Sequence, residues 1–194
     1  MVSEEKKITT GSSGREGGPD RIVLTGFRGT GKSLVGTRLA GQLGFDFIDT
    51  DDMLCAGLQC SLSDFVRDKG WHAFRQAERQ FLAKLVHTRN VVIATGGGAI
   101  MHHDMWQELR KGGLVVWLQA EAGTIRRRLE QDESSVSQRP SLTGNSLSGE
   151  VEEVLALREP YYAQGSDLTI DTTNMSPEEI TVHITKILTG GETE

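Results

Sequence analysis

The sequence lacks long apolar runs, an excess of basic residues and more than two cysteines, and each absence excludes a class of protein. No apolar run approaches the roughly 20 residues that a membrane-spanning helix needs. The N-terminus carries no apolar signal core, so we expect a cytoplasmic protein without membrane partners. Cys55 and Cys60 lack the second pair that a zinc site needs, and we expect free thiols.

The charge balance excludes a generally basic surface. Lysine and arginine number 21 against 27 aspartates and glutamates, which gives a formal net charge of −6. A protein of this charge shows no global sign of nucleic-acid binding. We therefore expect a small-molecule substrate and no nucleic-acid partner.

The remaining composition suits one globular domain. A chain of 194 residues with 37% hydrophobic content can bury a proper core. Residues 1–20 are polar and glycine-rich and predict a disordered tail, and residues 190–194 are expected to fray. The domain is thus expected at residues 21–189.

Strand-like and helix-like segments alternate along this domain. The strand candidates are continuously apolar, which is typical of strands buried on both faces of a parallel sheet. This order predicts an α/β fold, with a five-stranded parallel sheet between two layers of helices. The expected strands are 22–25, 45–48, 91–95, 114–118 and 168–170. The expected helices are 32–43, 61–69, 71–87, 103–111, 121–131, 148–163 and 177–188.

The octet GFRGTGKS at residues 26–33 fits the P-loop pattern and lies between a predicted strand and a predicted helix. Its glycines let the backbone wrap around a phosphate, and the N–H groups form a cradle for the anion. Lys32 can reach the β- and γ-phosphate oxygens, and the Ser33 hydroxyl can ligate Mg²⁺. The residues expected to contact ATP here are Gly29, Thr30, Gly31, Lys32, Ser33 and Leu34.

Three carboxylates follow the second predicted strand. Asp49 and Asp51 differ by two positions, so in an extended strand they point to the same side, toward the P-loop. One of them could help to hold Mg²⁺ through water, and the other could orient or deprotonate a substrate hydroxyl. Asp52 is interpreted as the N-cap of the next helix.

Two further features follow along the chain. Arg75 and Glu78 are three residues apart on a predicted helix and, taken alone, indicate a solvated surface pair. Gly96, Gly97 and Gly98 follow the third predicted strand directly, where they would let a ligand touch the backbone.

Adjacent histidines before a predicted helix suggest a metal site but support it poorly. His102 and His103 point in different directions, and no third ligand follows at metal-binding spacing. We interpret them as a surface helix start, with Asp104 as the cap.

Taken together, these motifs resemble the shikimate kinase family over roughly residues 21–189. The resemblance rests on their order along the chain, which is more specific than the P-loop alone. The matching motifs are 26–33, Asp49 with Asp51, Phe74-Arg75 with Glu78, 96–98, Arg139-Pro140, Arg158 with Tyr162, and Asp167 to Asp171.

The resemblance implies a function. The chain would transfer the γ-phosphoryl group of ATP to the 3-hydroxyl of shikimate, a step of chorismate and aromatic amino acid biosynthesis, as a monomer with Mg²⁺. Asp51 would bind the shikimate hydroxyls and act as the base, while Asp49 would support Mg²⁺ through water. Arg75 and Arg158 would bind the shikimate carboxylate, because planar guanidinium groups match a carboxylate. The glycines at 96–98 would contact the ring.

The resemblance also implies a mobile lid at residues 131–149. Arg139 within it would stabilise the transferring phosphoryl group, next to the catalytic Lys32 and Asp51. Adenine would lie between Arg127 and Pro177. Ser141-Leu142 after Pro140 and a longer stretch before Arg139 depart from the family pattern, which affects the lid and the arginine register.

Two alternatives stay open. The arginine pair suits any small carboxylate, so the acceptor could be another hydroxy acid such as gluconate. The chain could also be a nucleotide-binding regulator without transferase activity, although Lys32, Asp51 and Arg139 favour catalysis.

Overall fold

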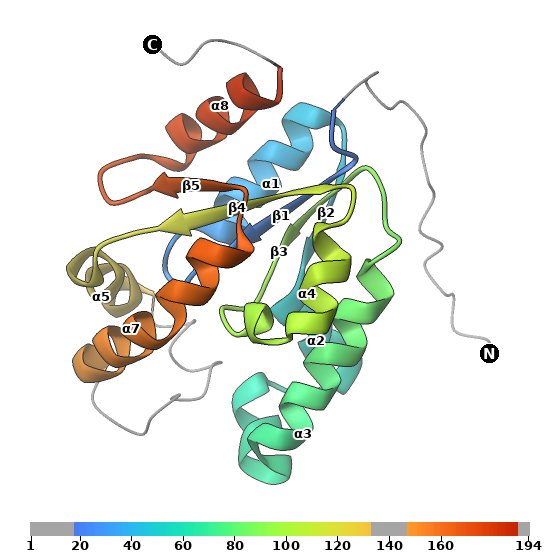
Figure 1. Ribbon diagram of the computed structural model, residues 1–194. Coiled ribbons are helices and arrows are strands. Elements are labelled where there is room, and N and C mark those ends of the chain that lie inside the picture. Colours follow the sequence, from blue (N-terminus) through green and yellow to red (C-terminus); the bar gives the residue numbers. More distant parts are fainter. Residues whose placement is uncertain (1–17, 133–146, 190–194) are drawn as a thin grey trace.

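A computed structural model of the chain describes residues 18–132 and 147–189. These residues form one parallel sheet of five strands between two layers of helices, which confirms the predicted fold class (Figure 1). The observed ends of the strands differ from the predicted ends by one residue at most. The strands are β1 (Arg21–Thr25), β2 (Asp46–Asp49), β3 (Val91–Ala94), β4 (Gly113–Gln119) and β5 (Leu168–Asp171).

The order of strands across the sheet is β2-β3-β1-β4-β5. β1 is central and pairs in parallel with β3 on one side and with β4 on the other. The carboxyl ends of all five strands therefore lie at one edge of the sheet, where ligands bind in folds of this type.

The helices agree with the prediction except near the second strand and the glycine triplet. α2 begins directly at the end of β2, and the short 3₁₀ helix η1 follows the triplet; neither was predicted. The predicted break at residue 70 is confirmed, because Gly70 has non-helical angles (φ 81°, ψ 165°) inside α3. The helices are α1 (Lys32–Leu43), α2 (Thr50–Leu58), α3 (Leu62–Leu85), η1 (Ala99–Met101), α4 (His103–Arg110), α5 (Ala122–Gln131), α7 (Leu147–Gly165) and α8 (Pro177–Leu188).

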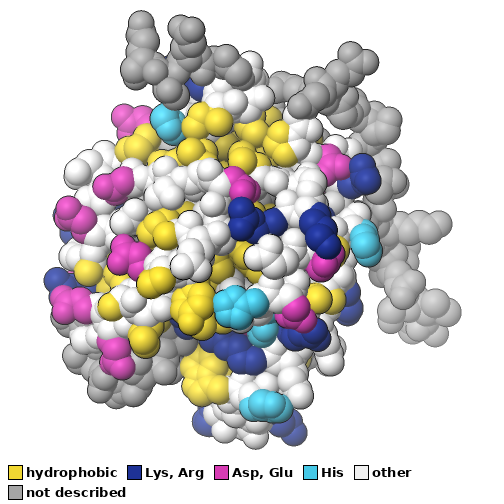
Figure 2. All heavy atoms as spheres, in the orientation of Figure 1, with side chains coloured by type: hydrophobic (Ala, Val, Ile, Leu, Met, Phe, Trp, Pro, Cys, Tyr) yellow, Lys and Arg dark blue, Asp and Glu magenta, His cyan; other side chains and the backbone are white. Residues whose placement is uncertain are grey.

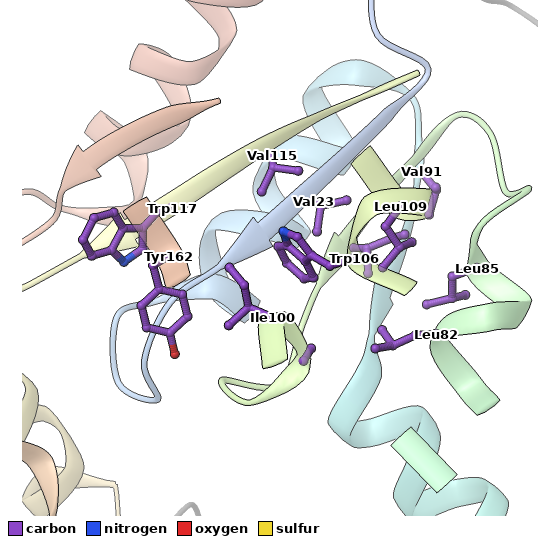
Figure 3. Close-up of a cluster of buried hydrophobic side chains, with 12 residues drawn as sticks. Val23, Leu82, Leu85, Val91, Ile100, Trp106, Leu109, Val115, Trp117 and Tyr162 are labelled. Carbon is purple, nitrogen blue, oxygen red and sulfur yellow. The ribbon is translucent and has the colours of Figure 1, made fainter. Parts of the chain in front are cut away.

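Successive residues of the central strand serve opposite faces of the sheet. Ile22 and Leu24 pack with α1 and α8 in one buried cluster. Val23 packs on the other face with residues of α3, α4 and α7, as Figure 3 shows. The aromatic rings of Trp106 and Tyr162 lie in this second cluster.

The surface, the N-terminal segment and the cysteines add four observations. In the ranges 18–132 and 147–189, no helix is both long and apolar enough to cross a membrane. On the face that Figure 2 shows, acidic and basic side chains are interspersed. Of the predicted tail, residues 18–20 are described, and Asp20 pairs with Arg89 at 2.9 Å, so ordered structure begins before residue 21. Cys55 and Cys60 are free thiols, as predicted.

A buried arginine at the start of β1 joins the ends of two helices. Arg21 is 4% exposed, and its guanidinium donates hydrogen bonds to backbone carbonyl groups at or just after the C-termini of α3 and α4. A positive charge at these ends also suits the two helix dipoles. The accepting carbonyls are those of Leu85, Val86, Thr88, Leu109 and Lys111.

We expect Arg21→Met to lower the free energy of unfolding by about 3 kcal/mol, because buried carbonyl groups lose their donors. The urea unfolding midpoint measures this change. Arg38→Met is the control, since Arg38 pairs with Glu178 with both side chains exposed, and this variant should change the unfolding midpoint little. Equal midpoints for the two variants would contradict the assigned role of Arg21.

Candidate functional site

The P-loop turns sharply at the carboxyl end of β1. Gly26 has a φ of 135°, and a Cβ at this position would lie 2.3 Å from the Leu118 carbonyl oxygen. Only glycine fits such a contact. Gly31 caps the start of α1 in the left-handed region, with a φ of 92°. The loop is therefore held against β4 and opens toward the N-terminus of α1, where anions bind.

Lys32 and Thr30 hold the loop from within. The Lys32 ammonium group donates to the carbonyl oxygens of Gly26 at 2.9 Å and Phe27 at 2.8 Å. The Thr30 hydroxyl also donates to the Phe27 carbonyl, at 2.8 Å. Lys32 and Thr30 are both buried. The lysine charge thus lies at the loop itself, where a phosphate would be bound.

A cavity of about 410 Å³ opens beside this loop. All the predicted ATP contacts at residues 29–34 line it, together with Pro177 at the start of α8. Its wall also contains Asp49, Asp51 and Thr95, which follow or end β2 and β3. This size and position suit a nucleotide.

The sequence predicted that Arg127 lies beside adenine, but the structure does not place Arg127 in the wall of this cavity. Arg127 is exposed and is not among the residues that line the cavity, whereas Arg128 lines it. Arg128 donates to the carbonyl oxygens of Gly29 at 3.3 Å and Thr172 at 2.7 Å. Burial lowers the pKa of Arg128, and the charge of Arg127 adds to that effect.

The carboxylates after β2 differ in arrangement from the prediction. Asp49, and not Asp52, is the N-cap of α2, because its Oδ1 accepts the backbone N–H of Asp51 at 3.0 Å and of Asp52 at 3.5 Å. Its Oδ2 accepts the Ser33 hydroxyl at 2.6 Å. Asp51 lies in the first turn of α2, so it does not share an extended strand with Asp49. The two still line one cavity, because the helix begins at the sheet edge.

A second, narrower cavity adjoins the first. Its volume is about 70 Å³, and it contains all the predicted substrate contacts: Asp51, Arg75, Gly96, Gly97, Gly98 and Arg158. Phe27, Leu62, Trp71 and Phe74 form its apolar wall. Asp51 lines both cavities.

The glycine triplet is closely surrounded by charged side chains. A Cβ on Gly96 would lie 2.6 Å from Asp51 Oδ1, and one on Gly98 would lie 2.3 Å from a terminal nitrogen of Arg75. The Thr50 hydroxyl accepts the Gly96 N–H at 2.8 Å, a buried contact that the sequence did not indicate. The triplet is thus needed for the close approach of charged side chains.

Arg75 and Glu78 are not the solvated surface pair that their spacing alone indicated. The Glu78 side chain is 2% exposed, and its Oε2 accepts a hydrogen bond from Arg75 at 2.5 Å. The Arg75 guanidinium also lies over the rings of Trp71, at 5.4 Å, and Phe74, at 5.3 Å. These contacts hold the guanidinium at the cavity wall.

A histidine completes the surroundings of Glu78. His102 Nε2 lies 2.8 Å from Glu78 Oε2. Burial acts to raise the pKa of Glu78, but the hydrogen bond from His102 and the charge of Arg75 outweigh it and lower that pKa. His102 therefore lies at an internal contact, and it, rather than Asp104, occupies the N-cap position of α4.

Arg158 of α7 lines the narrow cavity, and Tyr162 of the same helix contacts the glycine triplet. The Tyr162 hydroxyl donates to the Gly97 carbonyl at 2.6 Å. Burial raises the pKa of Tyr162 to about 12, although Arg158 acts in the opposite direction. A Cβ on Gly97 would be 3.5 Å from a terminal nitrogen of Arg158. Arg75 and Arg158 therefore approach the glycine triplet from different helices.

Two predictions concern residues that lie partly or wholly outside the described part of the chain. Arg139 and most of the predicted lid, residues 133–146, lie outside the described residues. The ends of the predicted lid belong to α5 and α7. Among the described residues, no group of three or more His, Cys, Asp or Glu side chains is placed to hold a metal ion.

Comparisons with known proteins agree on one family. A family model described as shikimate kinase matches residues 28–189. Shikimate kinase 2 of Photorhabdus laumondii is 41% identical over 170 residues, which cover 88% of this chain and 96% of that protein. Shikimate kinase 2 of Yersinia enterocolitica is 41% identical over 167 residues, with 86% and 94% covered. The structure of a shikimate kinase from Acinetobacter baumannii in complex with shikimate superposes with a TM-score of 0.82, at 27% identity, and covers 90% of this chain and 96% of that one.

The environment of Glu78 predicts a pH-dependent contribution to stability. Because its pKa is lowered in the fold, the ionised carboxylate stabilises the protein above the usual glutamate pKa, and this contribution is lost as pH falls through the lowered value. We expect Glu78→Gln to lower the free energy of unfolding by about 2 kcal/mol at pH 7 and by progressively less on acidification.

Urea unfolding at several pH values from neutral to acid measures this dependence. Glu108→Gln is the matched control, because Glu108 pairs with Lys111 at 2.7 Å with both side chains exposed. A difference between wild type and Glu78→Gln that does not change with pH would contradict the lowered pKa.

Proposed function

This chain belongs to the shikimate kinase family, and we propose that it transfers the γ-phosphoryl group of ATP to the 3-hydroxyl of shikimate. The products are ADP and shikimate 3-phosphate, and the reaction is a step of chorismate and aromatic amino acid biosynthesis. The observation that carries the proposal is the position of Asp51 in the wall of both cavities. A carboxylate there can contact an acceptor hydroxyl beside the donor phosphates.

On the donor side, the P-loop supports ATP binding. The backbone N–H groups at the N-terminus of α1 would receive the phosphates, and Lys32 would turn from the loop carbonyls to their oxygens. Arg128 and Pro177 line the same cavity. We therefore propose Arg128, in place of Arg127, as the arginine beside the adenine.

The residues at the end of β2 and the start of α1 fit Mg²⁺. Ser33 Oγ and Asp49 Oδ2 are 2.6 Å apart, and hydroxyl and carboxylate oxygens are the ligands that Mg²⁺ prefers. Ser33 would bind the ion directly and Asp49 through water. Bound with ATP, Mg²⁺ would neutralise charge on the phosphates.

On the acceptor side, two guanidinium groups face the narrow cavity. Arg75 and Arg158 would bind the shikimate carboxylate, and the bare backbone at Gly97 would lie against the ring. The cavity is narrow, so we expect these arginine side chains to shift when the acceptor enters. The apolar wall around Phe74 would exclude water from the ring face.

The reaction needs one proton acceptor. The 3-hydroxyl oxygen forms a bond to the γ-phosphorus, while the bond from that phosphorus to the β,γ-bridging oxygen breaks and ADP leaves. The hydroxyl proton passes to the Asp51 carboxylate. Arg139 stays a prediction for stabilising the transferring group, as do a monomeric state and a cytoplasmic location.

We expect wild-type protein with ATP and Mg²⁺ to release ADP when shikimate is added, and to give little release with gluconate, whose flexible chain lacks the ring that the cavity surrounds. A coupled ADP-release assay with both acids measures this difference. Preference for gluconate would support the other hydroxy acid as acceptor. No release with either acid would support the non-catalytic alternative.

We expect Asp51→Asn to reduce turnover with shikimate by at least about 100-fold, because the amide cannot accept the hydroxyl proton. Binding of ATP, measured by calorimetry, should stay within about twofold of wild type, since the P-loop is unchanged. Asp52→Asn is the matched control on the same turn of α2. Turnover of Asp51→Asn at the wild-type rate would contradict the role of Asp51 as base.

A further inference from the structure

His102 is a half-buried polar residue that the proposed reaction does not use. Its side chain is 11% exposed, and its Nε2 lies 2.8 Å from Glu78 Oε2. An ionised carboxylate can only accept hydrogen bonds, so Nε2 carries the proton and donates to Glu78. The His102 imidazole therefore donates a hydrogen bond to the buried carboxylate of Glu78 on α3.

The same carboxylate oxygen also receives Arg75. The Arg75–Glu78 contact is 2.5 Å and involves Oε2, as does the contact from His102. The other oxygen, Oε1, would be 3.2 Å from a Cβ on Gly96, so it faces the glycine triplet. Glu78 Oε2 thus accepts hydrogen bonds both from His102 and from Arg75, and Arg75 lines the acceptor cavity.

Two backbone hydrogen bonds hold the main chain of His102 in place. The His102 N–H donates to the Ala99 carbonyl at 3.1 Å, which closes η1, and the His102 carbonyl accepts the Trp106 N–H at 2.8 Å, which opens α4. Trp106 is itself buried. His102 is therefore connected through η1 to the glycine triplet that precedes this short helix.

These contacts determine how strongly Glu78 attracts Arg75. A buried carboxylate needs several donors, and His102 supplies one of them. Without this donor, Glu78 would depend more on Arg75 and would hold the guanidinium back from a bound acid.

We propose that His102 is a positioning residue for acceptor binding, which acts through Glu78 to orient Arg75 toward the acceptor carboxylate. The inference rests on the proposed function, because the acceptor is the acid that Arg75 binds. It predicts a change in the KM for shikimate and not in the steps that involve ATP.

The test compares His102→Ala and His102→Gln with wild type, using KM for shikimate, KM for ATP and kcat. We expect His102→Ala to raise the KM for shikimate about tenfold, with kcat and the KM for ATP within about twofold of wild type. Glutamine can place an amide N–H near the position of Nε2, so His102→Gln should restore most of the affinity. A role in stability alone would not produce this selective rescue.

His103→Ala is the matched control, because His103 is the exposed neighbour and its ring lies 5.4 Å from that of Tyr161. Its KM for shikimate should equal that of wild type. If the alanine variant of His102 does not fold, His102→Asn replaces it in the test. The asparagine side chain is shorter than that of histidine or glutamine and cannot reach Glu78.

Three results would overturn the inference. The first is an unchanged KM for shikimate in His102→Ala, or in His102→Asn where that variant replaces it. The second is a glutamine variant as impaired as the alanine or asparagine variant. The third is an equal rise in the KM for ATP. Absence of turnover by wild type with shikimate is a separate result: it contradicts the proposed function, and the inference fails with it.

Discussion

The close approach of the glycine triplet to its charged neighbours is the constraint on which the acceptor site depends. Asp51 and Glu78 lie against Gly96, and Arg75 lies against Gly98. Any Cβ at Gly96 or Gly98 would displace a charged side chain, so the triplet lets Asp51, the proposed base, and Arg75, the proposed carboxylate-binding residue, come within reach of one small ligand. The parallel sheet makes this possible, because β3 lies between β1 and β2 and ends at the same edge.

The charges at this edge need compensation because they are buried. Glu78 keeps a lowered pKa in a buried position only because a guanidinium and an imidazole both donate to it. Glu78 and one of its partners, Arg75, also line the narrow cavity. Electrostatic stability and the proposed recognition of the acceptor therefore depend on the same contacts, as is common at functional sites.

Much of this arrangement was predictable from local sequence. Continuous apolar runs located all five strands, and the spacing of glycines with Lys32 and Ser33 located the loop that lines the larger cavity. Other features depend on the fold. α2 was missed because it follows β2 without a loop, and the buried Glu78 contacts His102, 24 residues away. Arg127 and Arg128 are adjacent, so a turn of about 100° on the helix separates them, and sequence spacing alone does not choose between them.

One side chain, Asp51, lies between the proposed nucleotide site and the proposed site of an acid held by two arginines. A crystal structure of the protein with shikimate and a non-hydrolysable ATP analogue tests this most directly. We expect the 3-hydroxyl within hydrogen-bond distance of Asp51, the carboxylate on Arg75 and Arg158, and the terminal phosphate beside Lys32. A shikimate whose carboxylate contacts neither arginine, or whose 3-hydroxyl points away from Asp51, would contradict it.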